Sequence, residues 1–337
     1  MIKGNYRTLL KESLKSNETE EWLDIWFTRP IGLAIALGGG RLGITPNAIT
    51  LAGIVLGAVA GWMFHYTDIT HNAVGVALLM CANFCDSADG QLARLSNQKT
   101  LLGRMLDGFA SDVWFFCAYL AIVFRLWDCQ IPYTDITWQW WGLLLCAIAG
   151  LKCHSTQCAL ADYYRNIHLW FLKGDAGSEL DSYAKEQAIC ERLKTGGWTF
   201  ERIYHFFYKG YCRKQERLTP KFQAFFRDFK KSLTTADNGK TESNSKAEGG
   251  MTDNSKAEGN TEERVQRCAS LFLDGSRPLM PLTNILTHNT RAFVLFFAVL
   301  TNIPWLYPLF EIIVLQPLYW WMRYKHELLC DTLTKKL

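Results

Sequence analysis

Residues 86–112 read DSADGQLARLSNQKTLLGRMLDGFASD and place several carboxylates between two strongly apolar stretches of the chain. Ionisable side chains at membrane depth cost free energy and usually mark a functional site. Asp86 and Asp89 stand three residues apart, so they share one face of a helix, and Asp107 follows on the next apolar segment. Asp112 comes five residues after Asp107, which turns it roughly 140° away around a regular helix.

The average composition hides this contrast between apolar and charged parts. The 337 residues carry a net charge of +4 and have a mean hydropathy of −0.03, but the charges concentrate in residues 163–280. A net charge of this size does not indicate a nucleic-acid partner. The 11 cysteines lack CxxC spacing, so we expect reduced structural thiols.

Apolar segments predict an all-α integral membrane protein with a bundle of six transmembrane helices. The segments are 46–64, 72–86, 105–124, 138–160, 286–301 and 303–322. A span needs about 20 apolar residues, so the second and fifth also fit buried core helices. Lys and Arg are absent from 65–71, 126–137 and the turn at 302–305, but frequent in the other polar segments. This bias predicts a multi-pass protein with both termini in the cytoplasm, and we expect a bacterial inner (cell) membrane.

The polar parts of the chain divide the sequence into four expected regions. Residues 1–45 contain Trp22, Trp26 and Phe27 on one helical face, which predicts an interfacial helix or, equally, an ordinary packing helix. The other regions are the first four spans, which carry the acids, in 46–165, a cytoplasmic insert in 166–284, and the last two spans with the tail in 285–337.

The insert has two kinds of sequence. Residues 180–231 favour helices with basic and aromatic side chains, which suit a membrane surface or a small helical subdomain. Residues 234–262 are polar and contain NSKAEG at 244–249 and again at 254–259, so this part is predicted to be a disordered linker.

The residues around the acids favour metal-dependent phosphate chemistry. Gly90 and Ala93 keep the helix surface low, and Arg94 adds a cation with forked donors that suits a phosphate. Converging carboxylates repel each other unless a cation neutralises them, and hard oxygen ligands select Mg²⁺, Mn²⁺ or Ca²⁺. The alternative is that these acids simply cap a span at the membrane interface.

The pattern D-x2-D-G-x2-A-R-x8-G-x3-D resembles the signature of the CDP-alcohol phosphotransferase (CDP-alcohol phosphatidyltransferase) family. It is carried here by Asp86, Asp89, Gly90, Ala93, Arg94, Gly103 and Asp107. TPNAIT at 45–50 also resembles the family's sequence at the start of the first span. The resemblance covers about 46–165, and covers 285–323 by hydropathy only.

The resemblance implies a transfer of a phosphoalcohol group from a CDP-linked lipid or alcohol to an acceptor alcohol, with release of CMP, in phospholipid or phosphosphingolipid synthesis. It also implies a possible homodimer. The implied metal ligands for Mg²⁺ or Mn²⁺ are Asp86, Asp89 and Asp107. The implied contacts to the CDP moiety come from Asn47, Thr50, Gly90, Ala93 and Arg94.

The chain departs from the family pattern at its fourth acid. The family has an aspartate four residues after the third, where this chain has Ser111, and that aspartate is the expected base. Three readings follow. A π-bulge brings Asp112 into the site, or Ser111 replaces the base with a water or metal, or the protein has lost activity.

The acceptor site is expected near the end of the fourth span. Lys152 and His154 lie deep enough in an apolar run to bind an acceptor, although snorkelling is the other explanation for such cations. Glu311, inside the last apolar segment, is expected to pair with a neighbouring donor. An inositol-type headgroup is the favoured acceptor. The alternatives are transfer of a CDP-activated headgroup to a lipid alcohol, or a non-catalytic membrane scaffold of the same fold.

Overall fold

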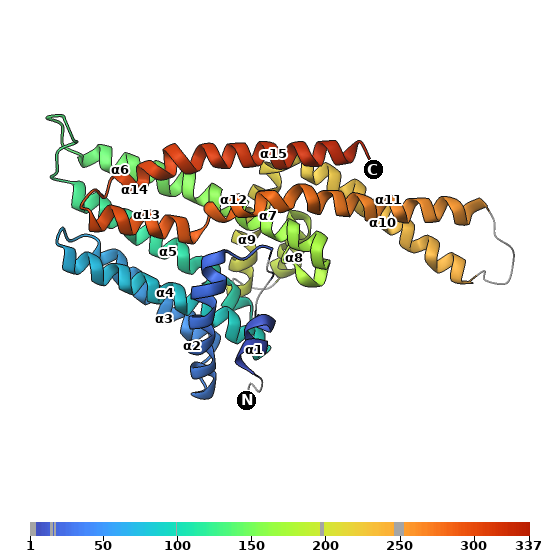
Figure 1. The fold of residues 1–337 in the computed structure, drawn as a ribbon, viewed down its shortest axis with the longest axis horizontal. Coiled ribbons are helices and arrows are strands. Elements are labelled where there is room, and N and C mark those ends of the chain that lie inside the picture. The colour runs from blue at the N-terminus through green and yellow to red at the C-terminus, as the bar shows by residue number, and fades with distance from the viewer. Residues whose placement is uncertain (1–4, 14–15, 17, 99, 196–198, 246–252) are drawn as a thin grey trace. The chain divides into compact units, whose positions relative to one another are not determined.

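The computed structural model describes residues 5–13, 16, 18–98, 100–195, 199–245 and 253–337 (Figure 1). These residues form helices joined by short turns, and their one β-type feature is an isolated bridge between Gln130 and Thr137. The all-α prediction is therefore confirmed for the described part of the chain. The chain divides into two compact units, residues 1–158 with 284–317, and residues 159–283 with 318–337.

Three long helices form the centre of the first unit: α3 (Pro46–Met63), α4 (Ile69–Leu95) and α5 (Leu101–Leu126) (Figure 1). Each begins with a polar side chain that accepts the N–H of the third residue on, and these caps are Thr45, Asp68 and Thr100. Such N-caps satisfy backbone donors that the first turn leaves unpaired, so they fix where each helix starts.

Glycines on α3 let its backbone approach both neighbouring helices. Gly53 faces Cys85 of α4, and Gly57 and Gly61 face α5. A Cβ built on Gly57 would lie 2.0 Å from the ring of Trp114. Small residues spaced in this way allow close helix packing in apolar surroundings, where side-chain burial from water gives little driving force.

Near the end of α5, Arg125 bonds to the end of α3, the start of α4 and the segment 299–302. Its buried guanidinium donates to the carbonyl oxygens of Phe64 (3.1 Å) and Val299 (3.3 Å). It also donates to the side-chain oxygens of Asn72 (2.9 Å) and Asn302 (2.6 Å). The bonds satisfy carbonyls at the C-terminal ends of two helices, where a cation is also favoured by the helix dipole.

An N-terminal arm packs on the other end of α4. It comprises α1 (Tyr6–Ser13), a π-helical turn η1 (Asp24–Thr28) and α2 (Arg29–Arg41), and α2 was not expected from the sequence. Gly32 of α2 sits against Ser87 and Gln91 of α4. Trp22 and Trp26 are exposed, as the interfacial-helix prediction requires.

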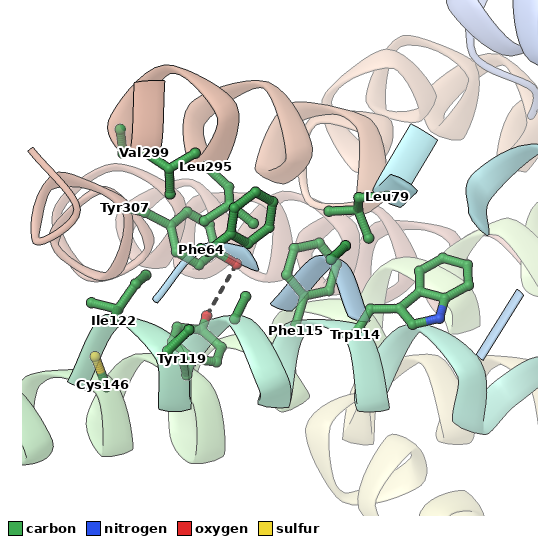
Figure 2. Packing of buried hydrophobic residues seen from close by; sticks show 14 of the residues in the cluster. Phe64, Leu79, Trp114, Phe115, Tyr119, Ile122, Cys146, Leu295, Val299 and Tyr307 are labelled. Carbon is green, nitrogen blue, oxygen red and sulfur yellow. Dashed lines mark hydrogen bonds between the residues drawn. The ribbon is translucent and has the colours of Figure 1, made fainter. Parts of the chain in front are cut away.

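The remaining helices of the first unit complete an aromatic core. They are α6 (Gln139–Ala147), the π-helical η2 (Ile148–His154) and the start of α7 (Ser155–Lys173), then α13 (His288–Leu300), α14 (Leu306–Phe310), the π-helical η6 (Glu311–Leu315) and the start of α15 (Gln316–Thr334). Figure 2 shows Phe115, Tyr119 and Tyr307 packed together, with a 3.2 Å hydrogen bond between the two tyrosine hydroxyls.

The second unit has a separate aromatic core. Its helices include α8 (Tyr183–Arg192), α9 (Phe200–Leu218), α10 (Pro220–Ser245), α11 (Asp253–Ser276) and α12 (Met280–Ile285), with the short 3₁₀ turns η3 (Asp175–Gly177), η4 (Leu193–Thr195) and η5 (Arg277–Leu279). Phe171 stacks on Phe272 at 4.1 Å, and Phe222 and Phe225 are fully buried. The helical prediction for 180–231 is confirmed. The insert thus forms a packed unit, which also includes residues 318–337.

The linker prediction for 234–262 stays a prediction. Residues 234–245 continue α10, and residues 253–262 begin α11 (Figure 1). Residues 246–252 lie outside the described part.

Helices occupy all six predicted apolar segments, but not all of them are long enough to span a bilayer by themselves. Three described helical stretches have the length and composition for this: Pro46–Met63, Leu101–Leu126 and Gln139–Lys173. The α13 helix has 13 residues, about 20 Å at 1.5 Å per residue. The count of six spans therefore stays a prediction.

The close packing of α3 predicts that one added methyl group lowers the stability of the protein. Gly57→Ala should lower the melting temperature of the purified protein, since overpacking costs about 1–3 kcal/mol. Gly38→Ala on α2 is the control, because no described heavy atom lies within 4 Å of its Cβ and alanine favours helices by about 1 kcal/mol over glycine. Thermal unfolding in detergent measures both, and equal shifts would contradict the packing account.

Candidate active site

The motif residues lie at three helix ends of the first unit. They come from the start of α3, the last turns of α4 and the first turns of α5. The Asn47 side-chain oxygen accepts a hydrogen bond of 3.4 Å from the Thr100 hydroxyl. A Cβ on Gly103 would lie 2.8 Å from the same oxygen. Gly103 therefore allows the start of α5 to approach the start of α3.

Asp89 is the buried acid of this group. It is 3% exposed, and among the residues that the structure describes neither of its carboxylate oxygens has a hydrogen-bond partner. The neighbouring Thr50 hydroxyl donates to the Pro46 carbonyl (3.1 Å) instead. Buried carboxylates are normally hydrogen-bonded, so these two oxygens are candidates to bind a cation.

A second acid acts on Asp89. Asp89 lies just beyond the predicted span 72–86, and burial, followed by the negative charge of Asp107, raises the pKa of its carboxyl to about 7. Asp107 is exposed and Asp86 is half-buried. Asp89 and Asp107 are thus close enough to repel each other, as the sequence predicted for acids on adjacent helices.

A folded-back arginine covers Gly90. Arg94 donates through Nε to the Ser13 carbonyl of α1 at 2.8 Å. A Cβ on Gly90 would lie 3.3 Å from the Arg94 Nη1 atom. The guanidinium therefore lies over Gly90, held by the N-terminal arm, and its charge also acts on Asp89.

These acids fit a divalent cation without forming a complete set of ligands. In the described part of the chain, no three acidic, histidine or cysteine side chains lie close enough to hold a metal ion. The fit rests on the unpaired oxygens of Asp89 and on the neighbouring charge of Asp107. Carboxylate oxygens are the hard ligands that Mg²⁺ and Mn²⁺ prefer.

The bulge expected near Asp112 is absent. The α5 helix is regular from Leu101 to Leu126, so the reading in which a π-bulge turns Asp112 toward Asp107 is wrong. Ser111 occupies the position one turn after Asp107 and is half-buried. Asp112 instead lines a cavity beside α5, together with His154 and Ser155. Helix periodicity alone produces this separation.

His154 belongs to a buried polar cluster that the sequence showed only in part. Its Nδ1 lies 3.2 Å from the Glu311 carboxylate, which also accepts from Arg291 Nε (3.0 Å) and the Tyr307 hydroxyl (2.7 Å). The pairing expected for Glu311 is confirmed. Lys152 is exposed, unlike His154.

Arg291 is the member of this cluster that sequence reasoning missed. It is fully buried and contacts Glu311 across the tight turn between α13 and α14. The sequence signal for this pair was a cation, Arg291, in the apolar segment 286–301 and an anion, Glu311, in the next apolar segment, 303–322. Such charges in a span usually face the bundle interior and pair with each other.

Residues 43–168 match the family model for CDP-alcohol phosphatidyltransferase. The matched segment contains α3, α4, α5, α6 and η2 and most of α7. The match confirms the resemblance carried by the motif between Asp86 and Asp107. No curated protein and no solved structure matches the chain.

The unpaired Asp89 predicts a measurable cation site. Mn²⁺ should bind the purified protein, and Asp89→Asn should weaken binding at least about tenfold, or 1.4 kcal/mol, because the buried anion is removed. Asp135→Asn, in the loop after α5, is the matched control. Electron paramagnetic resonance of free Mn²⁺ measures binding. Equal binding by both variants, or none by the wild type, would contradict the assignment.

Proposed function

We propose that this chain, whose residues 43–168 match the CDP-alcohol phosphatidyltransferase family, is a membrane phosphotransferase. It moves a phosphoalcohol group from a CDP-alcohol to an acceptor alcohol and releases CMP. The observation that carries the proposal is the meeting of the motif residues at the ends of α4 and α5, with the buried, unpaired Asp89 among them. The family supports a transferase of phosphate-containing groups and a role in phospholipid synthesis.

The motif residues would bind the donor. Asp86, Asp89 and Asp107 would hold Mg²⁺ or Mn²⁺, which when bound neutralises the charge that develops on the pyrophosphate. The small side chain of Ala93 would leave room for the CDP moiety. Gly90 leaves room for the Arg94 guanidinium, which Ser13 holds and which would present donors to a phosphate. Asn47 and Thr50, three residues apart at the start of α3, would contact the cytidine.

The acceptor would approach from the cavity that Asp112 lines. Its hydroxyl oxygen would form the new bond to phosphorus, and the bond from that phosphorus to the CMP oxygen would break. His154, on the same cavity, would contact the acceptor. Two candidates would take the hydroxyl proton: the Asp112 carboxylate, which the regular α5 turns about 140° from Asp107, or a water positioned by Ser111, which lies one turn after Asp107. A non-catalytic scaffold is favoured by Ser111 alone.

We further propose the membrane arrangement that the sequence predicts. Six spans, with the three long helices among them, would place both termini and the 166–284 insert in the cytoplasm, on the side of the motif. The loop charges support this orientation. The homodimer implied by the family and the bacterial cell membrane remain predictions.

The proposed reaction predicts a metal-dependent release of CMP. Purified protein with Mg²⁺, a CDP-alcohol and an acceptor should produce CMP, and Asp89→Asn should abolish this while the variant stays folded in the membrane. Removing the divalent metal with a chelator should have the same effect, and re-addition should restore turnover. Coupled detection of CMP measures both. Normal turnover by Asp89→Asn would show that the acids are not the donor site.

The position of the base predicts which of two variants loses more activity. Asp112→Asn should lower kcat by about 10²–10⁴-fold, the usual contribution of a positioned general base, and leave the KM of the CDP-alcohol nearly unchanged. Ser111→Ala should be mild. Steady-state kinetics of both variants decide the matter, and the reverse order would assign the proton transfer to the Ser111 side of α5.

A further inference from the structure

One face of α9, in the second unit, carries large apolar side chains that are not covered by the rest of the unit. They are Phe200 (52% exposed), Ile203 (39%), Phe206 (53%) and Phe207 (71%). At 100° per residue these four positions fall within about 120° of one another around the helix. A contiguous apolar surface of this kind marks an interaction site more often than scattered apolar residues do.

The other side of α9 is packed inside the second unit. Its buried residues are Tyr204, His205, Cys212 and Gln215. The His205 Nδ1 atom lies 2.6 Å from the Glu186 carboxylate, and the Gln215 side chain donates to the Ala159 carbonyl at 3.0 Å. These contacts fix the helix from one side, so the exposed aromatic face is left over from the packing of this unit.

The same face becomes basic toward the end of α9. Arg213 and Arg217 are exposed and Lys214 is half-buried, and by helix periodicity all three follow the apolar residues along one side. The two acids of α9, Glu201 and Glu216, lie at least about 120° from the centre of this face. In α9, which the structure describes in full, the exposed face therefore combines apolar and positive side chains without an acidic one.

We infer that this face of α9 docks on the surface of an anionic phospholipid bilayer. The aromatic side chains lie at the boundary between headgroups and hydrocarbon, and the cations lie on the headgroup phosphates. Lipid chains accept Phe206 and Phe207 without requiring hydrogen-bond partners, and anionic headgroups match the charge of Arg213 and Arg217. The inference does not depend on the proposed phosphotransfer.

A bilayer is favoured over a protein partner because the chain itself brings one near. Residues 174–199 connect the candidate span Gln139–Lys173 to the start of α9. A surface joined to a membrane span by a short connection meets the bilayer at a high effective concentration, so weak contacts suffice for docking. Docked in this way, α9 is an in-plane anchor for the second unit.

Photo-crosslinking from single positions of α9 tests the inference with the full-length protein. Phe207→p-benzoylphenylalanine places a photoreactive group on the proposed lipid-facing side, and Glu201→p-benzoylphenylalanine places it on the opposite side, which is also exposed. Each variant is reconstituted in nanodiscs of phosphatidylcholine and phosphatidylglycerol and irradiated, and its α9 peptides are analysed by mass spectrometry. Position 207 should give phospholipid adducts at least about fivefold more often than position 201.

The charge of the bilayer supplies the second arm of the test. In nanodiscs of phosphatidylcholine alone, adducts at position 207 should fall at least about threefold, because the attraction of the cations is lost. Arg213→Gln combined with Arg217→Gln should cause the same fall in the anionic nanodiscs. Arg227→Gln combined with Arg267→Gln removes the same charge from exposed positions of α10 and α11 and is the matched control.

Three results would overturn the inference. Equal lipid adducts at positions 207 and 201 would show that the face is not distinguished by the bilayer. Adducts of position 207 with protein in place of lipid would assign the face to a protein partner or a second copy of the chain. Equal yields in neutral and anionic nanodiscs would remove the role of the cations. Thermal unfolding verifies each variant, and Ile203→p-benzoylphenylalanine is the second position on the same face if the variant at 207 is unfolded.

Discussion

The buried carboxylate of Asp89 is the constraint on which the first unit depends. An unpaired anion in apolar surroundings is unfavourable, and a second acid, Asp107, adds to the cost. The arrangement is therefore stable only if something else neutralises the charge or keeps the carboxyl protonated. The glycines of α3 bring the helices close enough for this crowding to occur. Arg94, fixed by Ser13, brings a positive charge beside the acids. A bound divalent cation would complete the balance of charge.

The first unit contains two further polar clusters, and their placement gives it a direction. Arg125 joins the ends of α3, α4 and α13 far along α5 from the motif. The Arg291–Glu311 pair lies between the last helices and reaches the cavity through His154. Polar contacts of this kind fix helix positions where apolar surfaces alone would slide. The result is one end of α5 that carries acids and a cavity that leads to it.

The sequence predicted the helical class, the positions of the apolar helices and the family because each has a strong local signal. The motif spacing and the long apolar runs need no tertiary information. The errors arose where several helices must be known together. Helix periodicity correctly placed Asp112 off the Asp107 face, but the π-helical turns lie in η1, η2 and η6 and not in α5. The partner of Glu311, the cavity beside α5 and the core of the second unit depend on contacts between segments far apart in the chain.

The central claim is that a phosphoalcohol group moves from CDP to an acceptor alcohol. Phosphorus NMR of the purified protein with Mg²⁺ and each of several pairs of CDP-alcohol and acceptor alcohol tests it most directly, because every phosphorus-containing species is seen at once. The account predicts that CMP and a new phosphodiester appear in equal amounts, and that neither appears without the acceptor. CMP formed without the acceptor, or no reaction with any pair of CDP-alcohol and acceptor, would contradict it.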